Sequence, residues 1–445
     1  MGDIIQWMKK ASRFLSYLSA FFGLMTLIRS PKGRAGAVLW FPKLWAGAWA
    51  PILAILGALG ALLNLISGNL TAVLVGIFGA WAGIRHSVRV TRREENPFDR
   101  AFGADWEQPI SPELWERLNR PYELIQPARQ AGAIQKDINI GGLSPLPADL
   151  WIPPVNVPHS HLGVIFLHGG LWQAVDKDFL TRPLFTRLVN QGHVILDVAY
   201  SLAPGANIYR MLEEVKTAIG WMKTNASHLD IDPDRVVLMG SSGGAHLALL
   251  AAYTPNLPVF QPEDLKLDTS VRGVISTFGI TDMVAFFREY GETNPRQPEY
   301  SSQVTEDMLP RLHNKTILDR FITRSRAFPA VRYSNMPGGV LLLVKLFGGT
   351  LKEIPDVYQL FSPIAHVGRH CPPTLLISGD DDFVIDASHS RRLHHVLRSQ
   401  GVPCVHVEFP DSVHAFDQYI GVSRRVAPAA QMATNDIEQF LALMV

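Results

Sequence analysis

The sequence predicts an α/β fold, in which a mainly parallel sheet is covered by helices on both faces. A helical cap interrupts this fold, and a transmembrane helical hairpin precedes it. Apolar runs of strand length alternate with helix-length segments, one run leads through a glycine-flanked serine into a helix, and residues 44–84 carry no charge. The 445 residues hold 41 Lys and Arg against 40 Asp and Glu, a balance that argues against a nucleic-acid binder or an acidic tail protein.

Residues 1–95 are predicted to form a membrane region. Charged residues make up 18% of the chain, where roughly 25% is usual, and the deficit is concentrated in residues 44–84. A transmembrane helix needs about 20 apolar residues, so this stretch fits two spans, 44–66 and 70–84. We expect the second span to continue past Arg85, with that side chain reaching the membrane interface.

Two further features of this region bear on its packing and orientation. Small residues at Gly76, Gly79 and Gly83 would let the two spans approach closely. Lys and Arg lie before and after the hairpin and are absent from its turn, which places both ends, and the chain that follows, on the cytoplasmic face. The short uncharged stretch 14–28 fits a tilted span or an interfacial helix, and the basic residues before it favour the interfacial helix.

The rest of the chain divides into a linker and one large domain. Residues 96–136 are rich in proline and charge and are predicted to be a linker. Residues 137–445 form the α/β domain, with predicted strands at 163–167, 193–198, 235–239, 271–278, 374–378 and 404–409. Residues 284–360 are too long for an ordinary connection and are interpreted as a cap. Its apolar run 338–347 fits an acyl-binding wall, a bilayer contact or a buried cap helix.

A nucleophile is predicted where the strand 235–239 enters Gly240-Ser241-Ser242-Gly243-Gly244 and then a helix-forming segment. This is G-x-S-x-G in the strand, turn and helix context that the motif requires. The small neighbours permit a sharp turn that lifts the Ser242 hydroxyl above the sheet edge, at the head of a helix whose amides favour negative charge. Ser242 is therefore the predicted nucleophile, and Ser241 is the fallback.

An oxyanion hole is predicted at the end of the strand 163–167, which leads into His168-Gly169-Gly170-Leu171-Trp172. Glycines let a backbone approach a substrate carbonyl closely. We expect amides of Gly169 or Gly170 to join that of Gly243, the residue after the nucleophile, in stabilising an oxyanion.

A serine nucleophile needs a base, and the base needs an orienting carboxylate. Two loops after predicted strands supply candidates, namely His414 in one loop and Asp380, Asp381 and Asp382 in the other. His414 is the predicted base. Asp382 is the preferred acid, whereas Asp380 and Asp381 could instead cap or solvate the turn.

From about residue 137 onward the chain resembles the α/β-hydrolase esterases and lipases, including hormone-sensitive-lipase-like esterases, feruloyl-esterase-like enzymes and arylformamidases. The resemblance rests on HGGxW at 168–172, the YxLAP-like stretch 200–204, the serine pentapeptide, and the surroundings of the acid and base. It implies Ser242 as nucleophile, His414 as general base and then acid, Asp382 as its orienter, and amides of Gly169, Gly170 and Gly243 as oxyanion hole. Leu171 departs from the family, since lipase-type members carry a third glycine there, and the hairpin and long cap lie outside the common core.

The sequence thus predicts a membrane-anchored serine hydrolase that cleaves carboxylic esters, of a lipophilic kind, through an acyl-enzyme. An amidase or formamidase and a prenylcysteine methylesterase with the same triad are alternatives. So is a non-catalytic relative that binds a ligand. No metal or organic cofactor is implied. The expected partners are a small-molecule or lipid-like ester and the bilayer, without nucleic acid; the oligomeric state stays open, with a homodimer as one option.

Overall fold

The computed structural model describes residues 2–31, 34–93, 95–118, 122–124, 129–141, 145–262, 266, 268–291, 338–418 and 426–445. These residues fall into two compact units. The first unit comprises Met1–Arg129, Ile377–Ala387 and Val407–Leu443. The second unit comprises Gln130–Leu376, Ser388–His406 and Met444–Val445.

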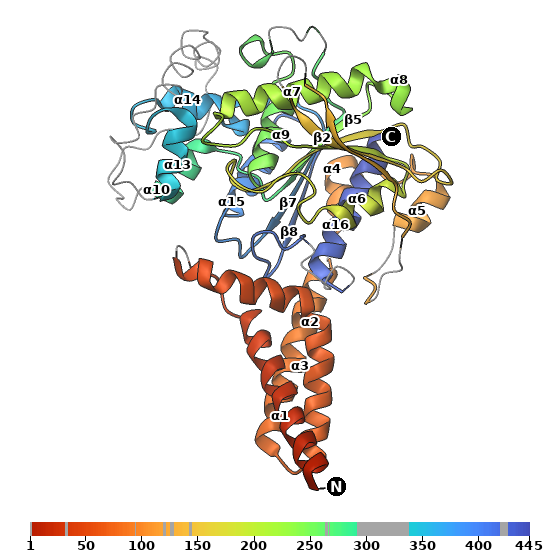
Figure 1. The fold of residues 1–445 in the computed structure, drawn as a ribbon, viewed down its shortest axis with the longest axis vertical. Coiled ribbons are helices and arrows are strands. Elements are labelled where there is room, and N and C mark those ends of the chain that lie inside the picture. The colour runs from red at the N-terminus through yellow and green to blue at the C-terminus, as the bar shows by residue number, and fades with distance from the viewer. Residues whose placement is uncertain are drawn as a thin grey trace. The chain divides into compact units, whose positions relative to one another are not determined.

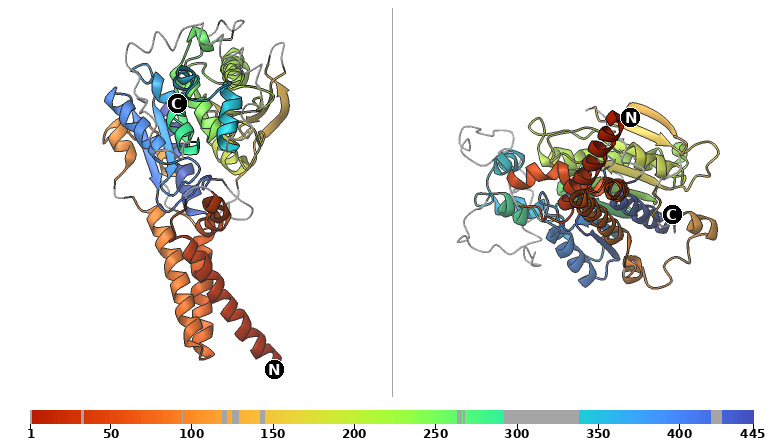
Figure 2. Two further views of the ribbon diagram at one scale, coloured as in Figure 1. Left: turned by 90° about the vertical axis from the view of Figure 1, so that its left-hand side faces the viewer. Right: turned by 90° about the horizontal axis from the view of Figure 1, so that it is seen from below.

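Three long helices open the first unit, α1 (Gly2–Met25), α2 (Arg34–Ile66) and α3 (Leu70–Thr91), and they run side by side (Figures 1 and 2). The predicted spans 44–66 and 70–84 lie within α2 and α3. α3 continues past Arg85 as expected, whereas α2 begins well before residue 44. Figure 1 shows that α2 bends sharply after its first part. Proline is the usual cause of such a bend, and α2 contains Pro42 and Pro51.

The first helix differs from its predicted bounds, since α1 ends at Met25 and reaches back to Gly2, where a helix over 14–28 was expected. Its polar residues bond to α2 in reverse order along the chain. The hydroxyl of Ser12 donates to Asn64 Oδ1 (3.2 Å), and that of Ser19 donates to the carbonyl of Leu53 (2.7 Å). α1 therefore lies lengthwise along α2 and antiparallel to it.

The small residues of α3 make the close approach that the sequence predicted, but toward two partners. A methyl group added at Gly76 would lie 2.7 Å from the carbonyl oxygen of Gly57 in α2, and one added at Gly83 would lie 2.5 Å from that of Ala50. One added at Gly79 would overlap the hydroxyl of Ser19 in α1. Glycine is thus required where α3 touches each of the other helices.

The outer surface of this bundle is apolar. By length and composition, the segments Ala35–Ile66 and Leu70–Thr91 could each cross a membrane. Among the described residues, the exposed large apolar side chains lie between Ile4 and Val88, apart from Leu124, Val155, Phe179 and Val445.

An eight-stranded sheet forms the centre of the α/β fold, in the order β1-β2-β4-β3-β5-β6-β7-β8. β3 pairs in parallel with β4 and β5, and β5 with β6, whereas β2 pairs antiparallel with β1 and β4. The strands are β1 (Ala133–Asn139), β2 (Pro147–Ile152), β3 (Gly163–Leu167), β4 (Val194–Val198), β5 (Val236–Ser241), β6 (Gly273–Thr277), β7 (Thr374–Gly379) and β8 (Cys404–Phe409).

The six predicted strands are confirmed as β3 to β8. The prediction missed β1 and β2, and β1 begins at Ala133, within the predicted linker 96–136. The short helices α4 (Pro97–Phe102) and α5 (Pro112–Leu118) also lie within the predicted linker.

Helices of the second unit pack onto its strands. α6 packs on β2 and β4, α7 on β3, β4 and β5, and the wholly buried α9 on β3, β5 and β6. The helices after α5 are α6 (Arg182–Val189), α7 (Ile208–Thr224), α8 (Ala226–Leu229), α9 (Gly243–Tyr253), η1 (Pro258–Phe260), α10 (Met283–Gly291), α13 (Gly338–Phe347), α14 (Pro355–Leu360), η3 (Pro363–His366), α15 (Ser388–Ser399) and α16 (Pro428–Met444).

The predicted cap 284–360 contains most of α10 and all of α13 and α14, while residues 292–337 lie outside the described residues. Its apolar run is the helix α13. Val344 and Phe347 are fully buried, and the ring centroids of Phe347 and Tyr358 lie 4.6 Å apart. Of the three interpretations of this run, the buried cap helix fits the described side chains, and contact with a bilayer does not.

Candidate active site

Ser242 lies at a strained turn between β5 and α9. Its backbone has φ 54° and ψ −119°, an unfavourable conformation for a residue with a side chain. The turn is held on both sides, since the amide of Ser242 donates to the carbonyl of Thr277 (2.9 Å) and the amide of His246 donates to the carbonyl of Ser242 (3.1 Å). This is the sharp strand-to-helix turn that the pentapeptide predicted.

The two outer glycines of the pentapeptide are required by close backbone contacts. A methyl group at Gly240 would lie 2.5 Å from the carbonyl of Gly244. A methyl group at Gly244 would overlap the carbonyl oxygens of Leu167 and His168, at the end of β3. The start of α9 therefore packs directly against the neighbouring strand, and only glycine fits there.

The glycine loop after β3 lies beside the serine. A methyl group added at Gly169 would be 3.4 Å from Cβ of Ser242, and one added at Gly243 would be 3.2 Å from the backbone nitrogen of Trp172. Gly170 adopts φ 96°, which favours glycine. The structure thus brings the three predicted oxyanion glycines and Ser242 into one region of the second unit.

The YxLAP-like stretch 200–204 forms hydrogen bonds with this loop. This contact was not predicted from the sequence. The Tyr200 hydroxyl donates to the carbonyl of His168 (2.8 Å), and the two rings stack with centroids 4.3 Å apart. The amide of Ala203 donates to the carbonyl of Trp172 (2.7 Å). Burial lowers the pKa of His168, which favours a neutral imidazole that braces the loop.

Asp382 and His414 form a hydrogen-bonded pair in the first unit. Nδ1 of His414 lies 2.7 Å from Oδ2 of Asp382, and both residues are buried. The other carboxylate oxygen of Asp382 accepts from the amides of Val384 (2.8 Å) and Ile385 (2.9 Å). The carboxylate is therefore fixed by its own loop and oriented toward the imidazole, as a general base requires.

The competing residues have other partners. The hydroxyl of Ser241 accepts from that of Thr277 (2.8 Å). Asp380 accepts from Arg29 (2.9 Å to its carbonyl, 3.3 Å to its carboxylate), and burial raises the pKa of that carboxyl. Asp381 binds Lys43 rather than capping or solvating the turn. The predicted site residues thus form two groups, Asp382 with His414 in the first unit and Ser242 with the three glycines in the second.

Two family models match the chain, the BD-FAE family over residues 148–317 and the prolyl oligopeptidase family over residues 346–433. Esterase LipQ of Mycobacterium tuberculosis is 30% identical over 317 residues, which cover 70% of this chain and 64% of LipQ. The probable carboxylic ester hydrolase LipM of the same organism is 28% identical over 296 residues, 66% of this chain and 57% of LipM. The chain thus spans less than two thirds of these relatives.

The solved structures agree with the family models on the fold. Butyrate-bound esterase Est2 from Thermogutta terrifontis matches with a TM-score of 0.50 at 19% identity, over 70% of this chain and 93% of Est2. The chain therefore has the α/β-hydrolase fold.

Helices that precede both matched ranges contact the loop after β7 that carries Asp382, the predicted acid (the acid loop), and the loop after β8 that carries His414, the predicted base (the base loop). Lys43 of α2 forms an ion pair with Asp381 (2.7 Å), and the two side chains are 3% and 4% exposed. The indole nitrogen of Trp40 donates to the carbonyl of His414 (2.9 Å). No sequence motif pointed to these residues, which are separated from their partners by more than 330 positions.

The end of α3 binds the base loop as well. Arg85 and Arg89 both donate to Asp411, at 3.1 and 2.8 Å. Arg85 was expected to reach the membrane interface, and in the structure its partner is Asp411. A partly buried carboxyl also lies three positions after His414, where burial raises the pKa of Asp417 to about 7.

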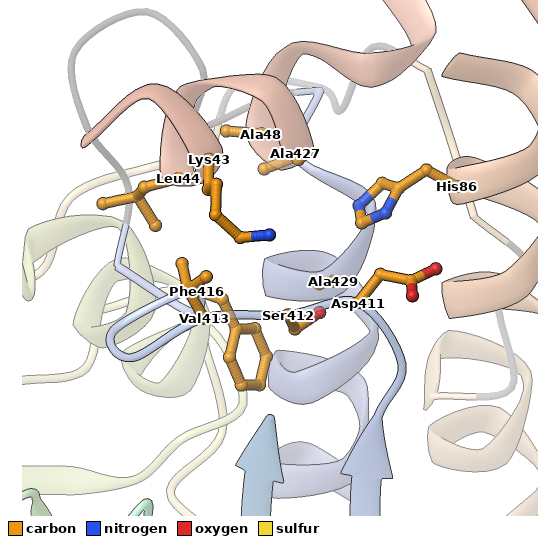
Figure 3. A pocket seen from close by; sticks show the side chains of 11 residues that line it. Lys43, Leu44, Ala48, His86, Asp411, Ser412, Val413, Phe416, Ala427 and Ala429 are labelled. Atoms are coloured by element: carbon orange, nitrogen blue, oxygen red, sulfur yellow. The ribbon is translucent and has the colours of Figure 1, made fainter. Parts of the chain in front are cut away.

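A small cavity lies between α2, α3 and the base loop (Figure 3). The ammonium of Lys43 and the ring of His86 point toward one another across it, with Asp411 below the ring. Among the residues that the structure describes, no group of three or more His, Cys, Asp or Glu side chains is arranged to hold a metal ion.

Proposed function

We propose that this α/β-hydrolase is a membrane-anchored serine hydrolase of carboxylic esters. The observation that carries the proposal is the strained backbone of Ser242 between β5 and α9, with a glycine loop beside it. Strained non-glycine residues cluster at functional sites, and at a strand-to-helix turn this strain presents the serine hydroxyl at the edge of the sheet. Similarity to LipQ and LipM, which are named as ester hydrolases, supports the choice of reaction.

We infer that Ser242, His414 and Asp382 act as one triad. Each lies in the turn or loop that follows a strand of the same sheet, namely β5, β8 and β7, and the loops after the strands of a mainly parallel sheet share one edge. The hydrogen bond between Asp382 and His414 supports the roles of acid and base. Their order along the chain, Ser, Asp and then His, is that of α/β-hydrolases.

The reaction would proceed in two steps. Nε2 of His414 accepts the proton of the Ser242 hydroxyl as the oxygen attacks the ester carbonyl, and Asp382 stabilises the imidazolium through Nδ1. The tetrahedral intermediate collapses to an acyl-enzyme when His414 returns the proton to the leaving alcohol. A water molecule then attacks the acyl group in the same way and releases the carboxylic acid.

The developing oxyanion would be stabilised by backbone amides of Gly169 or Gly170 and of Gly243. Their closeness to Ser242 supports this role. Each such donor is typically worth about 3 kcal/mol of transition-state stabilisation.

The proposed substrates are lipophilic esters, and the support is the N-terminal bundle. α2 and α3 are long and apolar enough to span a bilayer, and the outer faces of α1 to α3 expose large apolar side chains that water disfavours. An enzyme anchored in this way meets substrates that partition into the membrane.

Labelling of the full-length protein in detergent with a fluorophosphonate probe tests the nucleophile. We expect the wild type and Ser241→Ala to be labelled and Ser242→Ala to remain unlabelled. Equal labelling of Ser241→Ala and Ser242→Ala would overturn the assignment, and an unlabelled, inactive wild type would favour a ligand-binding protein.

The substrate class is tested with a panel of esters. We expect turnover to rise with acyl chain length and with partitioning into the membrane. Faster turnover of an aryl formamide would indicate a formamidase, and a requirement for an isoprenoid next to the methyl ester would indicate a prenylcysteine methylesterase. A flat profile over chain length would contradict the lipophilic preference.

A further inference from the structure

We propose that Trp40 and Lys43, near the beginning of α2, are positioning residues for His414 and Asp382. This inference rests on the proposed function of these two residues. It assigns a positioning role to two residues of a region whose sequence indicates only a membrane anchor.

The first step of the argument is that the acid and base loops are joined to one another. The amide of Asp381 donates to the carbonyl of Ser412 (3.1 Å), and the amide of Asp411 donates to the carboxylate of Asp380 (2.7 Å). A displacement of either loop would therefore move the other, and with it the hydrogen bond between Asp382 and His414.

The second step is that the acid loop is bound to the N-terminal helices through a buried charge. The carboxylate of Asp381, next to the predicted acid, faces the ammonium of Lys43 at 2.7 Å. The same carboxylate accepts from the amide (2.8 Å) and the hydroxyl (2.9 Å) of Ser30. A buried carboxylate held by several donors has one favourable position, so Lys43 and Ser30 fix the backbone of this loop.

The ammonium of Lys43 also organises the connection between α1 and α2. It donates to the carbonyls of Met25 (3.1 Å) and Ile28, on the chain segment that leads to Ser30. One side chain thus binds both the acid loop and the segment that supplies the other donors to that loop.

The third step concerns the base. The indole nitrogen of Trp40 donates to the carbonyl of His414 itself (2.9 Å), and the indole ring packs edge-on toward Phe383, with centroids 6.5 Å apart. Trp40 therefore contacts the backbone of the base and the side chain that follows the acid. Removal of the indole donor would take this hydrogen bond from the backbone of His414 and loosen the base loop at that residue.

These contacts predict a loss in the chemical step and not in substrate binding. A catalytic group that is misplaced by about 1 Å can lose about 100-fold in rate. We expect Trp40→Phe, which retains an aromatic ring, and Lys43→Met, which retains the length of the side chain, each to lower kcat by about 10- to 100-fold with little change in KM.

The matched control is Trp45→Phe. Trp45 lies on the same helix, is 44% exposed and stacks on Trp49, so the substitution removes an indole from α2 without touching either loop. We expect this variant to match the wild type.

The measurement is the second-order rate constant for labelling by a fluorophosphonate, together with kcat per labelled site, in full-length protein. A fraction of unfolded protein lowers the extent of labelling but leaves this rate constant unchanged. The rate constant therefore distinguishes a loss of folded protein from a misplacement of His414 or Asp382. Rate constants of Trp40→Phe and Lys43→Met within twofold of Trp45→Phe would overturn the inference. So would a decrease in the extent of labelling alone.

If Lys43→Met does not fold because Asp381 loses its partner, the double variant Lys43→Met/Asp381→Asn removes both charges. A rate constant for this double variant equal to that of the control would likewise contradict the role of Lys43. The Ser242→Ala variant separates the two hypotheses. If the wild type and Ser242→Ala are labelled equally, the proposed function fails. If labelling requires Ser242 but its rate constant is unchanged in Trp40→Phe and Lys43→Met, only the positioning role is refuted.

Discussion

Close backbone approach, and not catalysis, decides which residue stands at position 244. The first turn of α9 meets the end of β3 so closely that a methyl group at Gly244 would overlap two carbonyl oxygens. Neither carbonyl belongs to a flexible side chain that could turn away. The strain at Ser242 therefore persists because the backbone on both sides of it is fixed.

Replacement of Gly244 by alanine should destabilise the protein by about 3 kcal/mol, because the inserted methyl group forces α9 away from β3. Gly205→Ala is the control, since its nearest neighbour would lie at 3.4 Å, an ordinary contact. Thermal unfolding in detergent measures the difference. Similar melting temperatures for the two variants would contradict the close packing of the elbow.

A buried carboxyl in the centre of the sheet links stability to pH. Asp197 on β4 is fully buried and lies opposite Asp149 on β2, and it accepts a hydrogen bond from the amide of Asp178 (2.6 Å). Burial, with smaller contributions from these two carboxylates, raises the pKa of Asp197 to about 8, against the attraction of Lys177. In an unfolded chain the pKa of an aspartate is about 3.9.

The folded state holds the proton of Asp197 more tightly than the unfolded state does. The stabilisation that this proton provides is therefore complete at acidic pH and is lost as the pH rises through about 8. Between pH 5 and 8 the wild type should therefore lose about 1 kcal/mol per pH unit more than Asp197→Asn, which does not titrate. Denaturant unfolding at pH 5, 6.5 and 8 measures both proteins. Parallel curves would show that Asp197 is ionised in the folded state.

At the scale of elements, α1 is held to α2 by small polar side chains at helical spacing. Ser12, Ser16 and Ser19 are buried, and they meet Asn64 at one end of α2 and Leu53 further along it. Such hydrogen bonds are favourable where water is absent. Their reverse order shows that the first two helices share one interface over several turns.

Cysteines at Ser12 and Asn64 should therefore cross-link on oxidation. The pair Ser12→Cys/Leu53→Cys is the control, because Leu53 meets Ser19, which is about 10 Å from Ser12 along the helix. Mobility on a non-reducing gel after proteolysis between the helices measures the link. Equal cross-linking of both pairs would indicate that α1 lies across the bundle.

The success of the sequence prediction also varied by element. The strands β3 to β6 are buried along their whole length, so continuous apolar runs identified them. β1 gave no such signal, because most of its side chains are exposed. For α1, the apolar length of 14–28 suggested a short segment, and the three serines that pack against α2 in the structure did not enter that prediction.

At the scale of the whole molecule, the antiparallel order of α1, α2 and α3 has a consequence for topology. If α2 and α3 cross a bilayer, α1 crosses it beside them, and residue 4 lies on the opposite face from the end of α3. Charge counting favoured an interfacial first segment because of Lys9, Lys10 and Arg13. The interface with α2 argues for a third span.

Cysteine labelling in sealed, oriented vesicles tests this arrangement. Ile4→Cys and Glu107→Cys are both at exposed positions of the first unit, and a membrane-impermeant maleimide should label only one of them from each side. The native Cys371 and Cys404 are buried, which limits background labelling. Labelling of both positions from the same side would favour the prediction of an interfacial first helix over that of a third span.

The candidate site could be predicted from sequence only where a motif is local. Ser242 and the glycines are identified by short motifs of five residues each. His414 and Asp382 are identified because they follow predicted strands in the order typical of the family. The contacts of Trp40 and Lys43 join segments more than 330 residues apart, and no composition or spacing marks them. These contacts can be recognised only in the folded structure, because folding alone brings α2 to these loops.

The double ion pair of Asp411 bears on how the enzyme can be divided. Arg85 and Arg89, one turn apart at the end of α3, bind the same carboxylate three positions before His414. A fragment that starts at residue 96, chosen to obtain a water-soluble enzyme, would lack both arginines as well as Lys43 and Trp40. The boundary between the proposed anchor and the α/β domain along the chain is therefore not a boundary in the folded protein, and a truncation there would remove contacts of the proposed active site.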